Sequence, residues 1–487
     1  MAKLSRPILE RAARPNIVIV MTDQHAARVM GAAGDPAADT PALDALAARG
    51  VRFTAAHCPA PLCVPSRMAF LSGLEPHRSG VLSNDDFLPS DIPTFAHALG
   101  AAGYDCRLVG RMHFYGPDQL HGFAARPVGD IGPGWPGAGP PDIGPLTPAR
   151  GNRGAEVPGS GVGETSYQAY DAAVAGQGVA TLRELCAARD SGGAPFCAVV
   201  SLFCPHPPYI ALPEDHDAVA HRVGPPRLPP PPARHPALAE WAAAGGVDEI
   251  DAEAAMRARR AYYGLVRMID RLGGEVFDAV AKRDDTITIY LSDHGEALGE
   301  RGLWWKSTFY DESVTVPLVM AGPGLPQGVT DTRVTGLTDL TATLLDWAGA
   351  PVLPGQSGRS LLGAGHWQDR ATSSYYGGLM NIRTGAVRHR MLRRGDLKLC
   401  VYDGHPPTLH DLREDPNELH DRAADRPEAV AALTAELTEG WDAAALARRQ
   451  AISAERNAIL RDWVKATGPQ ERLRWRDPRP GRNRYLT

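Results

Sequence analysis

A cysteine stands at the predicted start of a helix in the stretch CPAPLCVPSRMAFLSG, residues 58–73. Cys63 comes shortly before Pro65, which suits a first helical turn because its missing N–H would have no partner there. The free N–H groups and the dipole of a helix N-terminus stabilise an anionic oxygen or sulfur. Cys63 is therefore a candidate for an anion site, although a free cysteine is most often a small buried apolar residue.

Polar residues also follow two apolar runs rich in β-branched side chains. The runs are NIVIVM and TITIYL, and the residues that follow them include Asp23 with Gln24 and Asp293 with His294. Such runs are typical of buried strands. Ligands of parallel α/β sheets bind beyond the carboxyl ends of the strands, so we expect these side chains at a ligand site.

The elements that must position these residues alternate between strand and helix. Strands are predicted at 16–21, 104–109, 196–203 and 286–291, and helices at about 41–49, 94–99 and 339–348. This alternation predicts an α/β fold with a large, mainly parallel central sheet and helices on both faces.

The pattern changes near residue 370. Short strands are predicted near 391–402 and an amphipathic helix at 427–437. We therefore expect a catalytic α/β domain over 1–370 and a smaller C-terminal α+β domain with an extended tail over 371–487. Two segments dense in Gly and Pro, 127–165 and 225–236, cannot be regular structure over their length. We interpret them as loops that cover a substrate, or as flexible surface insertions.

Composition excludes several classes of protein. The chain has 487 residues, 44% hydrophobic and 22% charged, with a net charge of -5, and so lacks the basic excess typical of nucleic-acid binding. No window approaches the roughly 20 apolar residues of a membrane span, and the first residues lack the apolar segment of a signal peptide, so we expect a cytoplasmic protein. Seven cysteines without close pairs predict neither a disulfide framework nor a zinc site.

The motif at Cys63 resembles the signature of the sulfatase family in the alkaline phosphatase superfamily. That signature is Cys-x-Pro-Ser-Arg followed by a Ser-Gly or Thr-Gly pair, seen here as CVPSR and MAFLSG. Further resemblances run in order along the chain: RPNIVIVMTDQ, TPALDALAARGVRF, IPTFAHALGAAGY, GRMHFYGPDQLHGF, SDHGEALGERGLWWK and LHDLREDPNELHD. The resemblance implies an alkaline phosphatase-like sandwich, with motifs similar to the choline sulfatase-like and arylsulfatase branches.

The resemblance implies a modified nucleophile at residue 63. In this family a formylglycine-generating enzyme reads the Cys-x-Pro-x-Arg core and oxidises the cysteine to formylglycine (3-oxoalanine). The hydrated aldehyde attacks the sulfur of a sulfate ester, which forms a covalent sulfo-enzyme, and elimination then releases sulfate. The implied activity is hydrolysis of an organic sulfate monoester.

The resemblance also implies one divalent cation. Asp23, Gln24, Asp293 and His294 match the metal-ligand positions of the family, together with residue 63. Carboxylate and amide oxygens are hard ligands that suit Ca²⁺ best, with Mg²⁺ or Mn²⁺ as alternatives, whereas His294 is a softer ligand.

Further positions match cationic and acid–base residues of the family. Arg67, Arg111 and Lys306 would orient the hydrate and the sulfate oxygens and offset negative charge. His113 matches the base that deprotonates the hydrate, and His206 matches the residue near the leaving-group oxygen.

The substrate is less well defined. Asn84 matches a polar substrate contact of related phosphonate hydrolases, or belongs to a plain turn. Tyr115, Trp135, Trp304 or Trp305 could supply an aromatic face for a cation, or could simply pack. Aryl sulfates, choline sulfate and sugar sulfates therefore stay open as the small-molecule partner.

Three alternatives to a sulfatase remain. A phosphonate monoester or phosphodiester hydrolase would use the same site, although Arg111 and His113 in the GRMH stretch favour the sulfatase pattern. The others are a noncatalytic metal-binding relative and a hydrolase that uses the Cys63 thiol directly. We also expect a homo-oligomer, in which the basic tail 463–487 wraps a neighbouring subunit or is loosely bound.

Overall fold

A seven-stranded sheet forms the centre of the computed structural model, which describes residues 14–149, 153–362, 367–377 and 387–486. Its strands, in spatial order, are β10 (Val329–Asp331), β2 (Val51–Phe53), β9 (Leu318–Ala321), β8 (Thr286–Ser292), β1 (Asn16–Asp23), β6 (Phe196–Pro205) and β4 (Asp105–Gly110). β1 runs parallel to β6 and β8, and β4 runs parallel to β6, whereas β9 is antiparallel to β8 and β2. The predicted α/β fold with a mainly parallel sheet is confirmed.

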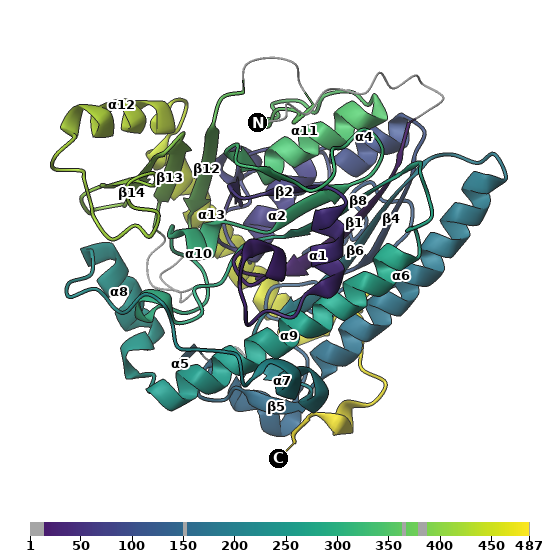
Figure 1. Ribbon diagram of the computed structural model, residues 1–487, viewed down its shortest axis with the longest axis horizontal. Coiled ribbons are helices and arrows are strands. Elements are labelled where there is room, and N and C mark those ends of the chain that lie inside the picture. The colour runs from purple at the N-terminus through teal and green to yellow at the C-terminus, as the bar shows by residue number, and fades with distance from the viewer. Residues whose placement is uncertain (1–13, 150–152, 363–366, 378–386, 487) are drawn as a thin grey trace.

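Helices cover both faces of this sheet (Figure 1). One face packs against α1 (Pro41–Ala48), α6 (Ser166–Asp190) and α9 (Ala252–Asp278), and the other against α2 (Cys63–Ser72), α4 (Phe95–Ala101) and α11 (Leu337–Ala348). Alternate residues of β1 enter the two layers: Val18 and Val20 join the first, and Ile17 and Ile19 the second. The central strands are apolar along their length because both of their faces are buried.

Several further elements are short or peripheral. They are β3 (Ala56–His57), α3 (Pro76–Ser79), α5 (Arg153–Glu156), β5 (Gly161–Glu164), β7 (Ile210–Ala211), α7 (Pro213–Val219), α8 (Pro236–Gly245), α10 (Asp311–Val314) and β11 (Thr335–Gly336), with 3₁₀ turns at Gly31–Ala33, Gly144–Ala149, Val247–Glu249, Glu300–Gly302 and Pro480–Arg482.

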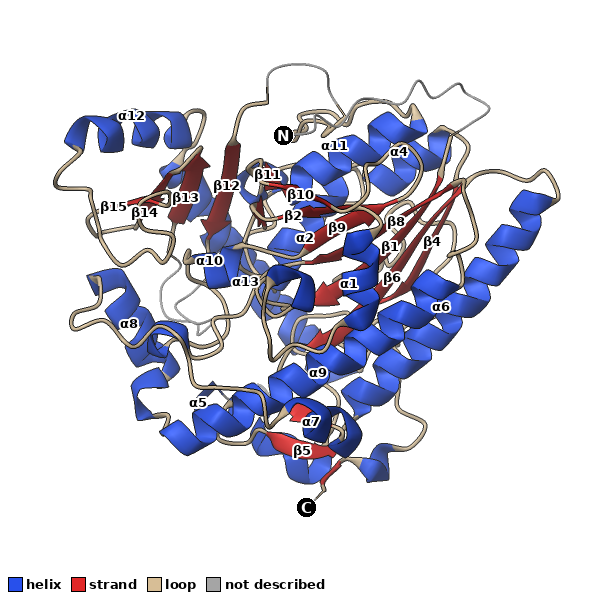
Figure 2. Ribbon diagram, in the orientation of Figure 1, coloured by secondary structure: helices blue, strands red, loops and turns tan. Residues whose placement is uncertain are grey.

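A second sheet follows in the C-terminal part of the chain. Its antiparallel strands are β12 (Arg370–Tyr375), β13 (His389–Arg394), β14 (Leu397–Val401) and β15 (Thr408–Asp411), and α12 (Pro427–Thr438) packs against them (Figure 2). Lys398 on β14 is fully buried, with Nζ 2.7 Å from Asp311 Oδ1 and 2.8 Å from Glu418 Oε1. This ion-pair network joins the second sheet to α10, and we propose residue 370 as the boundary between the two domains.

The C-terminal segment returns to the first domain. After α13 (Ala443–Thr467), the Trp475 N–H donates to the Asp130 carbonyl at 2.9 Å, and the Trp475 ring lies 5.3 Å from that of Tyr170. The last strand, β16 (Arg484–Tyr485), pairs with β5 in antiparallel orientation. The tail is therefore fastened to its own chain, which corrects the expectation of a loosely bound terminus, while its contact with a neighbouring subunit stays a prediction.

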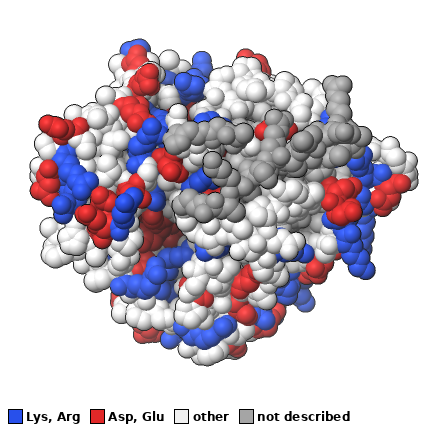
Figure 3. Space-filling model, turned by 45° about the horizontal axis from the view of Figure 1, so that its top comes forward, with Lys and Arg blue, Asp and Glu red and all other residues white. Residues whose placement is uncertain are grey.

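The structure also bears on composition-based expectations. Among the described residues, no helix combines the length and apolar character needed to cross a membrane. All seven cysteines are free, as expected. Acidic and basic side chains are interspersed over the face shown in Figure 3, in keeping with the small net charge. The cytoplasmic location and the homo-oligomer stay predictions.

Candidate metal and catalytic centre

The ends of two central strands and the start of α2 meet at one buried cluster. One potential ligand atom from each of Asp23, Cys63, Asp293 and His294 lies within 4.8 Å of the others, and all four residues are buried. Asp23 ends β1, and Asp293 and His294 directly follow β8. The parallel pairing of β1 with β8 brings these positions together.

Cys63 is the first residue of α2, so its side chain lies where the helix N-terminus meets this cluster. Its Sγ is 3.2 Å from His294 Nε2 and 3.6 Å from Asp23 Oδ1. Only 1% of Cys63 is exposed, and every residue of α2 is buried. The candidate nucleophile therefore lies among side chains of the types that bind metal ions.

Asn84 lies next to this helix start. Its Oδ1 accepts the Val64 N–H at 2.9 Å, so it satisfies one of the free donors in the first turn of α2. Asn84 thus contacts the backbone of Val64, the residue that follows Cys63.

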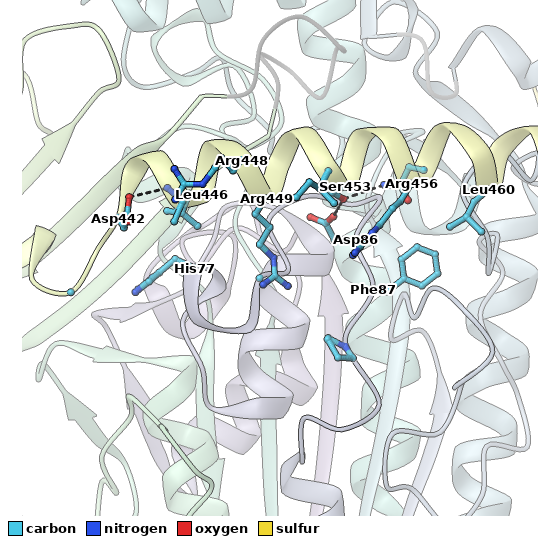
Figure 4. Close-up of a pocket in the computed structure, with 16 residues that line it drawn as sticks. His77, Asp86, Phe87, Asp442, Leu446, Arg448, Arg449, Ser453, Arg456 and Leu460 are labelled. Atoms are coloured by element: carbon cyan, nitrogen blue, oxygen red, sulfur yellow. Dashed lines mark hydrogen bonds between the residues drawn. The ribbon is translucent and has the colours of Figure 1, made fainter.

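Helix α13 holds the loop that carries Asn84. Ser453, Asn457 and Arg461 are spaced four residues apart and therefore lie on one helix face. Ser453 bonds to Asp86, the Asn457 Nδ2 donates to the Asp85 carbonyl at 3.0 Å, and Arg461 pairs with the Asp85 carboxylate. Figure 4 shows α13 lying across the loop with Asp86 and Phe87. A groove of about 790 Å³ lies between them.

Arg67 links the two carboxylates of the cluster, those of Asp23 and Asp293. Its guanidinium is fully buried, with Nε donating to Asp293 Oδ2 at 2.8 Å and Nη2 to Asp23 Oδ2 at 3.2 Å. Its other donors bond to Thr22 O, Arg111 O and Ser201 Oγ. Because Arg67 takes the Oδ2 atoms, the Oδ1 atoms of both carboxylates remain on the side of His294, where each is 3.7 Å from Nε2.

Arg111 and His113 are held by a carboxylate from the first Gly/Pro-rich segment. Arg111 donates from Nε to Asp23 Oδ2 at 2.6 Å, from Nη1 to Asp130 Oδ1 at 3.2 Å and from Nη2 to His113 Nδ1 at 2.9 Å. Asp130 Oδ2 also accepts the His113 N–H at 2.7 Å. Segment 127–165 therefore contributes a residue that orients two candidate catalytic side chains.

The charges around the cluster set its protonation. Burial alone would raise the pKa of Asp23, but Arg111 and Arg67 hold it well below its ordinary value of 3.8. Burial lowers the pKa of His294 and of His113, where Arg111 lowers it further. Burial and the charge of Lys306 bring the pKa of His206 well below 6.5. The carboxylate is thus anionic and the imidazoles neutral near pH 7.

Lys306 and Gln24 meet at the edge of the cluster, where Lys306 Nζ donates to Gln24 Oε1. His206 Nδ1 lies 2.7 Å from the Pro207 carbonyl, which leaves its Nε2 for another partner. The structure therefore brings the predicted metal ligands, cationic residues and histidines together at the carboxyl ends of the strands.

Sequence reasoning missed several buried polar residues that support this centre. They are Asp130, Ser201, Tyr209 and Glu296. Glu296 lies three residues after Asp293 inside the quoted SDHGEALGE stretch, so that motif offered a signal. Asp130 lies in an aperiodic segment that gave none.

The aromatic candidates divide into two groups. Trp304 and Trp305 are 2% and 0% exposed and pack in the core, which favours the packing alternative for both. The Tyr115 ring is half-buried and its centroid lies 5.8 Å from that of His113, and Phe87 links it to Trp135.

The residues present fit a divalent cation of the hard class. Asp23 and Asp293 supply carboxylate oxygens, and Gln24 supplies an amide carbonyl. His294 Nδ1 lies 3.0 Å from the Gly295 carbonyl; a neutral ring that donates there keeps the Nε2 lone pair toward the cluster.

Comparisons with protein families agree with this chemistry. A family model described as Sulfatase matches residues 15–350, and one described as N-sulphoglucosamine sulphohydrolase, C-terminal, matches residues 299–443. The chain is 35% identical over 436 residues to a choline-sulfatase of Rhizobium meliloti, covering 83% of this chain and 82% of the relative. It is 27% identical over 463 residues to arylsulfatase K of Rattus norvegicus, covering 88% and 78%.

Solved structures share the fold. A protein in complex with its substrate D-glucosamine-2-N,6-O-disulfate superposes with a TM-score of 0.70 at 21% identity, covering 88% of this chain and 99% of the other. A phosphonate monoester hydrolase of Agrobacterium radiobacter has a TM-score of 0.67 at 24% identity, covering 88% and 95%.

Proposed function

Because the chain belongs to the sulfatase family of sulfate ester hydrolases, we propose that it cleaves an organic sulfate monoester with a formylglycine derived from Cys63 and one divalent cation, Ca²⁺ first. The observation that carries this proposal is the buried cluster of Asp23, Cys63, Asp293 and His294 at the strand ends. A formylglycine-generating enzyme would be the partner that modifies Cys63.

Two groups supply chemistry that the side chains alone lack. The hydrate of formylglycine provides an oxygen nucleophile, and a divalent cation lowers the proton affinity of such an oxygen. Asp23, Gln24, Asp293 and His294 would hold the cation together with residue 63.

The remaining side chains orient and move protons. Arg67 and Arg111 fix the Asp23 carboxylate, and Lys306 adds a cation that can offset charge on sulfate oxygens. His113 and His206 are neutral near pH 7 by the direction of their pKa shifts. His206 can accept a proton at Nε2, because its Nδ1 donates to the Pro207 carbonyl. His113 Nδ1 accepts from Arg111, so His113 presents an N–H at Nε2 and would act as a base only once the bond to Arg111 is broken.

For the substrate we propose choline sulfate. The relative at 35% identity is a choline-sulfatase, and the half-buried Tyr115 ring beside His113 offers an aromatic face to a quaternary ammonium. Aryl and sugar sulfates are the competing substrates.

The test combines mass spectrometry of residue 63, in protein produced with the modifying enzyme, with sulfate release from choline, aryl and sugar sulfates. We expect a formylglycine mass, activity that EDTA removes and Ca²⁺ restores, and the highest kcat/KM for choline sulfate. Faster hydrolysis of a phosphonate monoester would favour the phosphonate hydrolase alternative.

The thiol and noncatalytic alternatives predict different results. An unmodified Cys63 with hydrolytic activity would favour the thiol hydrolase. An unmodified, inactive protein that binds Ca²⁺ would favour the metal-binding relative.

A further inference from the structure

One further buried carboxylate lies next to the centre and has no role in the chemistry above. Glu296 is fully buried. Its Oε1 accepts the N–H groups of Leu298 and Trp305, each at 2.7 Å, and its Oε2 accepts the Tyr209 hydroxyl at 2.7 Å and the Gln24 amide nitrogen. Because a carboxylate only accepts hydrogen bonds, all four donors must point at it.

The Gln24 side chain therefore has one orientation. Its Nε2 donates to Glu296, and its Oε1 accepts from Lys306 Nζ. The reversed amide would set its NH₂ against the ammonium and its carbonyl against the carboxylate. An acceptor on one side and a donor on the other thus direct the Gln24 carbonyl away from Glu296.

The backbone of Gln24 is held as well. Its φ of 71° lies in the left-handed region, which is uncommon for a residue other than glycine. Its N–H donates to Asp293 Oδ1 at 3.0 Å, and its carbonyl accepts the Tyr262 hydroxyl at 2.7 Å. With the backbone fixed, the amide orientation decides which atom Gln24 presents to a cation.

Glu296 also holds the loop that ends in Lys306. Three non-glycine residues of this loop have positive φ: Leu298 (52°), Arg301 (56°) and Trp305 (61°). Such conformations persist only where the surroundings over-determine them. Leu298 and Trp305 both donate their N–H groups to Glu296, so the carboxylate stabilises the strained path of the chain up to Lys306.

We propose that Glu296 is a positioning residue that directs the side-chain carbonyl of Gln24 toward the cation and places the Lys306 ammonium beside that carbonyl. This role rests on the proposed function, since it assumes a divalent cation at the centre. It needs no contact between Glu296 and the substrate.

The first test is Glu296→Gln, which keeps the shape but replaces one acceptor oxygen by a donor. The new NH₂ must oppose either the Gln24 amide or the two backbone N–H groups. We expect Ca²⁺ affinity, measured by calorimetry on the protein without substrate, to fall about 10- to 100-fold. Unchanged Ca²⁺ affinity with a lowered melting temperature would show a purely structural role and overturn the proposal.

A swapped pair provides the matched rescue. In Glu296→Gln with Gln24→Glu, the new amide can donate to the new carboxylate, which still accepts from Lys306. We expect this double variant to bind Ca²⁺ more tightly than Glu296→Gln does. If Glu296→Gln fails to fold, we expect the double variant to fold and to bind Ca²⁺. A swapped protein that binds no better, or does not fold, refutes the proposal.

Tyr209→Phe is the control, because it removes one donor to the same oxygen but leaves the carboxylate. It should weaken Ca²⁺ binding less than Glu296→Gln does. An equal or larger loss would assign the effect to packing around Glu296 and count against the proposal.

Hydrogen exchange separates this proposal from the proposed function. Glu296→Gln should speed exchange at the Leu298 and Trp305 amides while the central strands keep their protection. If the parent protein binds no Ca²⁺, the metal part of the proposed function fails. Exchange then decides alone: faster exchange supports the placement of Lys306 by Glu296, and unchanged exchange overturns it.

Discussion

Asp130→Asn tests whether a residue of the Gly/Pro-rich segment is needed for the centre. Asp130 Oδ1 accepts from Gly132 N at 2.9 Å and Arg111 Nη1 at 3.2 Å, and Oδ2 accepts from His113 N at 2.7 Å. An asparagine presents an NH₂ to one of these sides in either orientation. At least one charge-assisted bond is lost, each worth about 1.5–3 kcal/mol, and the buried ion pair with Arg111 is lost with it.

We therefore expect Asp130→Asn to lower the free energy of unfolding by about 2–4 kcal/mol in urea titrations at pH 7. The rate should fall too, because His113 has a φ of 63° and its N–H is held by Asp130. A displacement of about 1 Å in a catalytic group can cost about 100-fold, so we expect kcat for sulfate release to drop about 10- to 100-fold.

The pH dependence gives an internal check. Burial raises the pKa of Asp130, but Arg111 and the neighbouring cations outweigh it, so the folded-state pKa lies below 3.8. The stabilisation is therefore complete above the unfolded-state value and is lost as the pH falls through the folded-state value. The stability gap between parent and variant should be constant near neutrality and narrow below about pH 4.

Asp118→Asn is the matched control. Asp118 also accepts backbone N–H groups, from Leu120 and His121, but its side chain is 30% exposed. We expect a loss below about 1 kcal/mol. If Asp130→Asn stays within about 0.5 kcal/mol of the parent and keeps its rate, Asp130 does not position the centre.

Three further tests, two of them with a matched control, address helix packing and ion pairs around the two sheets. In α6, the Cβ of Gly176→Ala would meet no atom within 4 Å, so this substitution should raise the free energy of unfolding by about 0.5–1 kcal/mol. The Cβ of Gly178→Ala would lie 2.9 Å from a valine of β6, so this substitution should not stabilise the protein. Equal effects of the two substitutions in thermal denaturation would contradict this reasoning. Lys398→Met leaves the buried Glu418 carboxylate without this cation and removes one of two cations beside the half-buried Asp311, so it should cost about 3–5 kcal/mol in denaturant titrations. A neutral result would argue against the ion-pair network. Arg461→Ala should cost about 0.2–1 kcal/mol and loosen the loop next to α2, while Arg456→Ala, which forms no ion pair within the described part of the chain, should have no effect on stability or sulfate release.

Much of the fold could be predicted because its main elements are long and strongly patterned. The predicted strand at 16–21 became β1 (Asn16–Asp23), and that at 286–291 became β8 (Thr286–Ser292). Pro41 begins α1 as expected, since it lacks the N–H that a first turn leaves unpaired. These signals are local, so a single sequence carries them.

The supporting shell of the site depends on contacts between distant segments. Tyr209 and Glu296 meet across 87 residues, and their pairing leaves no periodic trace in either segment. The two tryptophans of the GLWWK stretch lie beside Lys306, but the positive φ of Trp305 turns the backbone so that their rings enter the core. Proximity to a motif therefore did not predict which side chains face the site.

The burial of α2 restricts when another enzyme could act on Cys63. In the folded chain Cys63 is 1% exposed and Arg67 is fully buried, so the Cys-x-Pro-x-Arg core offers no surface for another protein to read. The oxidation that we propose at residue 63 would therefore have to precede the docking of α2. During synthesis β8, which begins at Thr286, leaves the ribosome long after this motif. The motif therefore stays exposed during translation until β8 and the elements after it have been synthesised and can pack over it.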